Sequence, residues 1–445
     1  MKKLLLLCTL LFLTTAAHAV PAPAVNELPL GSPWNDVDVW VAENPRGDAL
    51  IADAARIREI NETMRRKESS LIDLESVPES VSGDYVHRYV AAATPAYDTY
   101  YTPNIQLTWD GYVKALENRN MASMYGDRAV RYGVTVSRGD LRLLPTSVCW
   151  AESPGDTHYD SLQATAVDPS EPVLILTESV DGEFYFILTR CYAGWLKKGD
   201  LALTDRAAWL TYVRPEDFSV VTHSRYTPSG EGPAAGEKAE KLHSSRAFYQ
   251  LGARIKRLAD GRYVFPISDG GGNLIEEVFS AAPGSAKALH DGYLPYTEGN
   301  IVKMAFRHLG DVYGWGGQDD SVDCSAFVQN VYRTMGIEIP RDADQQERAM
   351  LHTISLEGMN HSERLEALRR APAGSLLFRP GHVMLYLGEA SGTPMVIHSL
   401  SSYYKDTPQG RVRTKVRQVL VSSALFATRS GATNLDACTS IGWVK

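Results

Sequence analysis

The chain has 445 residues, of which 44% are hydrophobic and 22% are charged, and this ordinary globular composition excludes collagen-like, low-complexity and wholly disordered proteins. At about 100–200 residues per domain, the length predicts two to four domains. The 53 acidic residues outnumber the 45 basic ones, which gives a net charge of −8. With no basic patch in the sequence, this charge disfavours binding to nucleic acid or to an anionic membrane surface.

The first 19 residues have the three parts of a secretory signal peptide. Lys2 and Lys3 form a positive start, Leu4–Leu13 forms a short apolar run, and Ala17-His18-Ala19 supplies the small residues of a cleavage site. The run is shorter than the about 20 apolar residues of a membrane span, and no later stretch approaches that length. We therefore expect an exported chain in the periplasm or cell-wall space, without membrane insertion, that begins near Val20.

Removal of that segment leaves four of the five cysteines, Cys149, Cys191, Cys324 and Cys438. Four cysteines are too few for a disulfide scaffold in an exported chain of this size. Two alternatives remain open for Cys149 and Cys191, which lie in one expected β domain. They form a disulfide bridge, or both are unpaired.

Residues 20–115 are expected to form an N-terminal helical segment. The apolar residues from Asp48 to Leu74 recur at helical spacing, with charged residues between them. This pattern predicts an amphipathic helix that packs on the other domains as a clip, followed by irregular linkers.

The middle of the chain contains a short repeat. The segment Asp181–Leu188 returns as Asp260–Ile267, 260 − 181 = 79 residues later, and each copy opens with Asp-Gly before aromatic and β-branched residues. An Asp-Gly turn before such a run is typical of a hairpin strand. Further strands are expected near 132–136, 173–177 and 194–196, and a loop at 230–236. These features resemble two bacterial SH3-like barrels, at residues 116–205 and 206–290.

A cysteine is expected at the start of a buried helix in the last 150 residues. Thr297 caps a first helix that ends at Gly310, and the glycine-rich segment Tyr313–Gly317 follows. Asp323-Cys324-Ser325 then opens a second helix that ends at Gly336. Free backbone N–H groups at a helix start favour a thiolate, so we expect the pKa of the Cys324 thiol to fall from about 8.5 toward neutrality. The same groups could stabilise an oxyanion.

Two histidines are expected to lie together on one sheet face. Residues 381–388 alternate as a strand that places His382, Met384 and Tyr386 on one face, and residues 395–399 form a second strand after a short turn. If the strands pair antiparallel, His398 lies beside His382, which supplies a base and an orienting polar group for a cysteine nucleophile. Four other histidines are assigned to surface or core positions: His290, His308, His352 and His361.

Residues 297 to 445 resemble the NlpC/P60 cysteine peptidases. The motifs that carry the resemblance are Tyr313-Gly314-Trp315-Gly316-Gly317, Asp323-Cys324-Ser325, Pro340-Arg341 with Gln345, Gly381-His382-Val383, and His398. The family usually has glycine where this chain has Ala326, a change that we expect to affect only packing. The resemblance implies a papain-like domain at 291–445. The whole chain would then be an α+β multidomain protein, with a helical N-terminal segment and two SH3-like β-barrels before this domain.

The resemblance also implies roles for single residues. Cys324 would be the nucleophile, His382 the general base and later acid, and His398 the orienting group, while the Cys324 N–H and the Tyr313 hydroxyl would form the oxyanion hole. The residues implied to contact substrate are Trp315 in the groove, Asp323 and Ser325 at the substrate's N-terminal end, and Tyr192 in a wall from the first SH3-like unit. No metal and no cofactor is expected.

The resemblance also implies a murein substrate. Members of this family with two SH3-like units cleave the bond between D-γ-glutamate and a diamino acid. For this chain we therefore expect a monomer that acts on L-Ala-γ-D-Glu-diaminopimelate peptides with a free N-terminus. Two other functions are weighed against this one. Cys324, His382 and His398 could be ligands of a catalytic zinc, or the chain could be a peptidoglycan-binding protein with an inactive peptidase domain.

Overall fold

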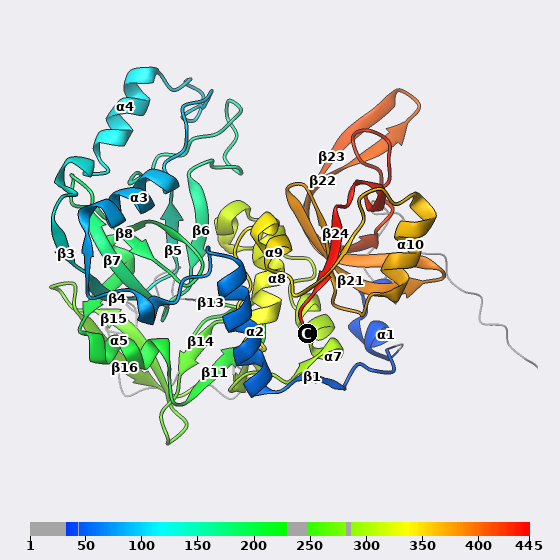
Figure 1. The fold of residues 1–445 in the computed structure, drawn as a ribbon, viewed down its shortest axis with the longest axis horizontal. Helices are drawn as coiled ribbons and strands as arrows, with labels where there is room; N and C mark the ends of the chain where they lie inside the picture. Colours follow the sequence, from blue (N-terminus) through cyan, green and yellow to red (C-terminus); the bar gives the residue numbers. More distant parts are fainter. Residues whose placement is uncertain (1–32, 43, 229–247, 282–285) are drawn as a thin grey trace, which may run out of the picture.

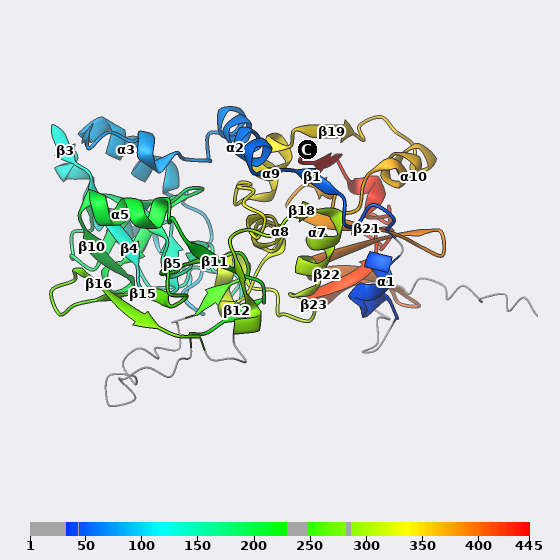
Figure 2. The same ribbon diagram turned by 90° about the horizontal axis from the view of Figure 1, so that it is seen from below.

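The computed structural model describes residues 33–42, 44–228, 248–281 and 286–445. Both the expected signal peptide and the expected loop at 230–236 lie outside these residues. A β-rich half, which holds residues 80–290, stands beside a C-terminal half that holds a second large sheet, and residues 37–52 lie against the C-terminal half (Figure 1). Seen from below, helix α2 lies across the junction of the two halves (Figure 2). No helix in the described ranges is long and apolar enough to cross a membrane.

The N-terminal segment is helical in part. Its elements are α1 (Val37–Ala42), β1 (Leu50–Ala52), α2 (Ala54–Lys67), β2 (Ser80–Ser82), α3 (Gly83–Ala93) and α4 (Trp109–Glu117). Strand β3 (Asp127–Ala129) follows this segment and pairs with β2. Helix α2 begins after Asp53, whose carboxylate accepts the Arg56 N–H, and it ends where Glu68 turns extended. It is thus shorter than the 48–74 span over which the apolar spacing extends.

One face of α2 packs against the C-terminal half. Ile60 and Met64 are buried there. The side-chain amide of Asn61 makes two hydrogen bonds across this contact. Its Nδ2 donates to the Gly336 carbonyl at 2.8 Å, and its Oδ1 accepts the Glu338 N–H at 3.0 Å. The helix is therefore joined to the chain segment that follows the cysteine-bearing helix.

Truncation of Met64 to alanine is expected to lower the free energy of unfolding by about 2–5 kcal/mol, because the removed side chain leaves a cavity between α2 and the C-terminal half. Urea unfolding measures this change. Glu62→Ala, an exposed position on the same helix, is the control and should stay within about 0.5 kcal/mol of the parent. If Met64→Ala changed the free energy of unfolding as little as Glu62→Ala does, α2 would be a dispensable spacer.

The first β-unit is a seven-stranded sheet in the order β10-β4-β7-β8-β9-β5-β6. Its strands are β4 (Arg131–Thr135), β5 (Gly139–Arg142), β6 (Gln163–Val167), β7 (Pro172–Glu178), β8 (Phe184–Leu188), β9 (Ala193–Lys197) and β10 (Leu201–Thr204). The strands expected near 132–136, 173–177 and 194–196 are confirmed. The first copy of the repeat covers the turn of the β7–β8 hairpin and strand β8, and this turn places Gly182 at φ 75°.

The second β-unit follows α5 (Arg206–Val213). Strand β11 (Phe218–Val221) pairs with β14 (Arg254–Lys256) and β17 (Leu289–Asp291), while β15 (Tyr263–Ser268) pairs with β16 (Leu274–Phe279) and β12 (Arg225–Tyr226) with β13 (Tyr249–Gln250). The second copy of the repeat again precedes a strand, β15, with Gly261 at φ 85°. The turn again joins antiparallel segments, through the Arg257–Tyr263 bridge, but the described strands of this unit are divided among three small sheets.

The C-terminal half is a six-stranded sheet, β19-β24-β20-β21-β22-β23, with helices packed on it. Its elements are β18 (Tyr296–Thr297), α7 (Glu298–Phe306), α8 (Cys324–Arg333), α9 (Ala343–Ala349), β19 (His352–Ser355), α10 (His361–Arg370), β20 (Leu376–Arg379), β21 (His382–Ala390), β22 (Thr393–Thr407), β23 (Gly410–Ser423) and β24 (Ser440–Trp443).

Strand β21 divides its side chains between two cores, as its alternation predicts. Val383 and Leu385 pack in the core that includes α8, whereas Met384 and Tyr386 pack in a core on the other face. Strands β21 and β22 pair antiparallel, with Leu385 opposite Ile397. This register carries His398 to the face that holds His382 and confirms the expected hairpin.

Candidate active site

Cys324 is the first residue of α8, as the sequence predicts. Asp323 caps the helix, and its carboxylate accepts the Ala326 N–H at 2.9 Å. The sulfur is buried and interacts with the backbone N–H groups of Val383 and Ser325. The Val383 contact places the sulfur at the start of β21, next to His382.

The thiol is less acidic than the sequence argument predicts. Burial, followed by the nearby Asp323 carboxylate, raises the pKa of Cys324 to about 12. The N–H groups of Val383 and Ser325 act in the opposite direction but do not compensate. The expectation of a pKa near neutrality is therefore wrong for the free protein, because the helix-start effect was considered without the cost of burying a charge.

The two histidines form a buried hydrogen-bonded pair. His382 Nε2 lies 2.8 Å from His398 Nδ1, and the exposed fractions of the two residues are 6% and 0%. Burial lowers the pKa of His382 well below its usual value, with His398 as the next cause, and burial lowers the pKa of His398 to about 3. Both rings are neutral at pH 7, so His382 is in the form that accepts a proton.

Ser422 lies on the far side of His398. Its Oγ is 3.0 Å from His398 Nε2, and the Phe426 ring stacks on the imidazole at 5.6 Å. Sequence reasoning did not select this serine, because only the β22–β23 register brings it near His398. The sequence signal that could have identified Ser422 is its place directly after the apolar residues Val419, Leu420 and Val421, on a strand that could pair with the one that carries His398.

These lowered histidine pKa values predict an acid-labile fold. Below pH 6.5 the unfolded histidines take up protons that the folded ones exclude, so each contributes a loss of about 1.4 kcal/mol per pH unit as the pH falls. We expect His398→Gln to reduce this slope between pH 6 and pH 5, measured by urea unfolding. His352→Gln, at an exposed position of β19, should not change it. Identical slopes for both variants would contradict the prediction.

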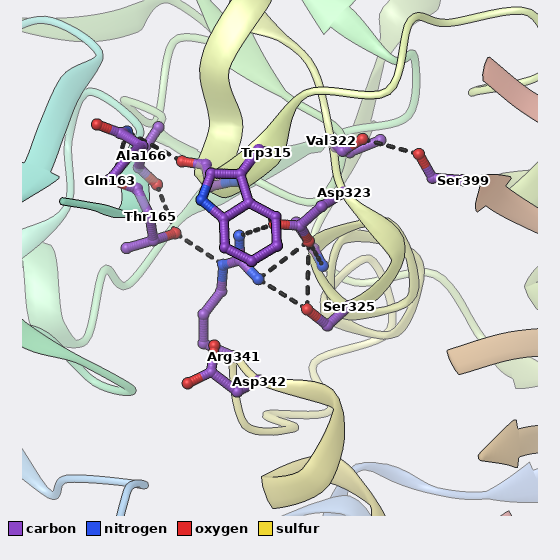
Figure 3. Close-up of polar contacts among 12 residues, drawn as sticks. Gln163, Thr165, Ala166, Trp315, Val322, Asp323, Ser325, Arg341, Asp342 and Ser399 are labelled. Carbon is purple, nitrogen blue, oxygen red and sulfur yellow. Dashed lines mark hydrogen bonds and ion pairs between the residues drawn. The ribbon is translucent and has the colours of Figure 1, made fainter. Parts of the chain in front are cut away.

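Asp323 is held by an ion pair rather than left free for a ligand. Arg341 donates to both of its carboxylate oxygens, at 3.1 and 2.6 Å, and to Ser325 Oγ at 2.8 Å (Figure 3). The Gly316 N–H donates to the same carboxylate at 2.9 Å. Burial acts against the carboxylate, but Arg341 holds the pKa of Asp323 below its usual value. Sequence reasoning quoted Arg341 as part of a motif but gave it no role.

The same arginine connects α8 with the first β-unit. Its Nε donates to Thr165 Oγ1 of β6 at 2.8 Å (Figure 3). At the other end of α8, Arg333 pairs with the buried Asp168, which also binds Arg138 at 2.6 Å. The first β-unit therefore contacts both ends of the helix that carries Cys324.

The glycine-rich segment lies directly against β6. Gly316 and Gly317 have φ values of 56° and 87°, and a Cβ on them would come within 2.7 Å of Gln163 O and 2.6 Å of Ala166 Cβ. Gln163 Nε2 donates to the Gly316 carbonyl at 3.0 Å. Glycine is required here both for its left-handed backbone and for this close approach.

Tyr313 and Trp315 both belong to this segment, and Tyr313 interacts with Cys324. Tyr313 is buried, and burial followed by the charge of Cys324 raises its pKa, so its hydroxyl keeps its proton. Trp315 is 40% exposed, and its Nε1 donates to the Asp160 carbonyl at 3.1 Å. Tyr159 packs between this segment and β22, with its hydroxyl 2.8 Å from Ser401 Oγ.

Strand β22 is tied to the chain just before the cysteine. Ser399, next to His398, donates to the Val322 carbonyl at 2.9 Å (Figure 3). This bond fixes the histidine-bearing strand relative to Asp323 and Cys324.

Tyr192 faces a carboxylate that the sequence argument did not select. Asp342 is next to Arg341, and burial raises the pKa of Asp342 in spite of Arg341 and of a contact with the Tyr192 hydroxyl. Burial also raises the pKa of Tyr192. Unlike Asp323, Asp342 is thus a carboxylate whose charge its surroundings do not fully compensate.

The cysteine and the two histidines are not arranged as a metal site. The ring nitrogens His382 Nε2 and His398 Nδ1 lie 2.8 Å apart and are hydrogen-bonded to each other, so these two atoms are not both available to a metal ion. In the described ranges, no group of three or more histidine, cysteine or acidic side chains is placed to hold a metal ion. The four cysteines Cys149, Cys191, Cys324 and Cys438 are all free, so Cys149 and Cys191 form no bridge.

Comparisons with known proteins agree with this geometry. Residues 310–417 match the NlpC/P60 family, and residues 151–197 match the SH3 domain (SH3b1 type). Dipeptidyl-peptidase 6 of Lysinibacillus sphaericus is 34% identical over 91 residues, which are 20% of this chain and 29% of that protein. The chain therefore spans less than a third of this curated relative.

Two solved structures are similar to this chain to different degrees. An NlpC/P60 endopeptidase from Photobacterium damselae subsp. piscicida superposes with a TM-score of 0.71 at 18% identity, over 92% of this chain and 96% of that one. An NlpC/P60 family protein from Bacillus cereus ATCC 10987 matches with a TM-score of 0.48 at 16% identity, over 70% of this chain and 99% of that one. At these identities the first likeness shows the fold alone. The C-terminal half of this chain therefore contains a domain of the NlpC/P60 family, a family of cysteine peptidases that hydrolyse peptidoglycan, and an SH3 domain of the SH3b1 type precedes it.

Proposed function

We propose that this protein is an exported cysteine endopeptidase that hydrolyses the D-γ-glutamyl–diaminopimelate bond of murein peptides with a free N-terminal L-Ala. The observation that carries the proposal is the buried Cys324 at the start of α8, beside a neutral His382 that His398 holds at 2.8 Å. This is the arrangement that a thiol nucleophile and its base require.

The chemistry follows from these three residues. His382 takes the proton of Cys324 as the sulfur attacks the scissile carbonyl, and His398 orients the ring that becomes positively charged. The Cys324 N–H and the Tyr313 hydroxyl stabilise the oxyanion. His382 then returns the proton to the leaving amine, and water releases the acyl group from the sulfur. The high pKa of the free thiol means that the thiolate forms only as His382 becomes charged beside it.

Asp342 with Tyr192 is the pair that we propose for the substrate's amino group, in place of Asp323. The Asp323 carboxylate already accepts bonds from Arg341, Gly316 and Ala326, so it has little capacity left for an ammonium ion. Asp342, whose charge is destabilised by burial, gains from a cation beside it. Ser325 and Trp315 remain proposed contacts to the peptide.

The first β-unit limits the length of the peptide on this side. Strand β6 and Tyr192 stand beside Arg341 and Asp342, and in the proposed complex they leave room for two residues before the scissile bond. A stem peptide attached to glycan has an amide in place of the amine, and its sugar would collide with this wall. We therefore expect free tri- and tetrapeptides to be cleaved and intact peptidoglycan to be a poor substrate.

The test compares L-Ala-γ-D-Glu-diaminopimelate with its N-acetylated form. The parent should cleave the free peptide much faster, and Asp342→Asn should lower kcat/KM on the free peptide by about 10- to 100-fold, the value of one charged hydrogen bond, while leaving the slow rate on the acetylated peptide unchanged. Asp344→Asn, at an α9 position that pairs with Arg348, is the matched control. Equal parent rates on both peptides would point to a hydrolase that works directly on the wall.

The same proposal covers the rest of the chain. Residues 1–19 would be a signal peptide, 20–115 a structural clip, 116–205 and 206–290 two SH3-like barrels, and 291–445 the peptidase domain of a monomer. Two peptidoglycan-associated domain types in one chain support a location in the periplasm or cell-wall space.

A further inference from the structure

A buried hydroxyl completes a chain of hydrogen bonds that begins at His382. His382 Nε2 lies 2.8 Å from His398 Nδ1, and His398 Nε2 lies 3.0 Å from Ser422 Oγ. Ser422 is fully buried, and Phe426 covers the His398 ring. The far end of this chain is therefore closed to exchange of protons with solvent.

The direction of the hydrogen bonds is set at the Ser422 end. A hydroxyl has one proton to donate, and Ser422 Oγ lies 3.1 Å from the Ser423 carbonyl oxygen, which only accepts. With its proton given to this carbonyl, the hydroxyl accepts from His398, so the proton of the neutral His398 ring is on Nε2. His398 Nδ1 then accepts from His382 Nε2, and the lone pair of His382 is on Nδ1.

We infer that Ser422 is a positioning residue that fixes the tautomers of both histidines and thereby leaves His382 Nδ1 unprotonated for the proton of Cys324. If the chain ran in the opposite direction, His382 Nδ1 would already carry a proton and could not accept a second one. The inference goes beyond the proposed function and uses it only in taking His382 as the base.

The first test reads the tautomers directly. Nitrogen-15 NMR of the full-length parent protein, with labelled histidine, is expected to show His398 protonated on Nε2 and unprotonated on Nδ1. A His398 ring protonated on Nδ1 would overturn the inference. This measurement does not depend on hydrolysis, so it remains decisive even if no murein peptide is cleaved and the proposed function fails.

The second test uses variants on the free tripeptide. Ser422→Ala is expected to lower kcat about 10-fold or more with KM within about twofold, because the hydroxyl lies behind His398 and away from substrate. Ser422→Thr, which keeps the hydroxyl, should restore kcat. Ser375→Ala removes another buried serine hydroxyl of the same domain and should leave kcat unchanged.

An unchanged kcat in Ser422→Ala, or a loss that a folded threonine variant does not restore, would show that the hydroxyl has no directing role. If the threonine variant does not fold, the NMR assignment of the parent protein decides alone.

Discussion

Cys324→Ala is expected to abolish hydrolysis of the free tripeptide, with a fall in kcat of at least about 10⁴-fold, while the melting temperature stays close to that of the parent. Removal of a nucleophile leaves only binding and oxyanion stabilisation, which give a small residual rate. The side chain is buried but small, and alanine at the start of a helix is well tolerated. Mass spectrometry of the digested peptide and a thermal scan measure the two quantities.

Three comparisons make this result specific. Cys438→Ala removes a second buried free thiol of the same half and should keep full activity. A thiol alkylator should inactivate the parent at Cys324, whereas a chelator should not. Loss of activity on chelation that zinc restores would support the metal hypothesis, and a Cys324→Ala protein with full activity would exclude the cysteine mechanism. A parent that binds murein peptides without cleaving them would favour the non-catalytic alternative.

Arg341→Leu is expected to lower the free energy of unfolding by about 3–5 kcal/mol. The guanidinium is 3% exposed and binds Asp323, Ser325 and Thr165, so its removal leaves a buried carboxylate without its counter-charge. The cap of α8 would be disturbed at the same time, and we expect kcat to fall even at temperatures where the variant is folded. Urea unfolding and tripeptide hydrolysis measure the two effects.

The matched control is Arg370→Leu. This side chain is 66% exposed, and its ion pair with Glu366, which is 57% exposed, lies at the surface. Pairs of this kind contribute about 0–1 kcal/mol, so the variant should unfold almost as the parent does. If both leucine variants were equally stable, the buried network around Asp323 would not hold the helix start in place.

The local parts of the candidate site could be read from the sequence. Asp323 is a residue type that caps helix starts, so the sequence predicts that Cys324 begins α8. The alternation of residues 381–388 gives the two faces of β21, and antiparallel pairing with the next strand brings His398 to His382. These inferences need only short-range rules of capping and alternation.

The rest depends on contacts between distant segments. Ser422 reaches His398 through the register of a long hairpin, and Thr165 reaches Arg341 from another domain. The thiol pKa could not be predicted either, because the degree of burial of Cys324 is a property of the assembled core. The ion pair of Asp323 could not be predicted for the same reason. The sequence shows that Asp323 directly precedes Cys324, but it does not show that Arg341 binds this carboxylate.

The bonds between the first β-unit and the two ends of α8 also constrain how such a protein can be recombined. A chimera that exchanges this unit for another SH3 domain would lose Thr165 and Asp168 together, so Arg341 and Arg333 of the peptidase domain would each lose one partner in the same step. One of these arginines lies in the helix that carries Cys324, and the other lies just after it. Exchange of the first β-unit would therefore also disturb the helix that holds the nucleophile. The two domains are therefore expected to be inherited, and engineered, as a pair.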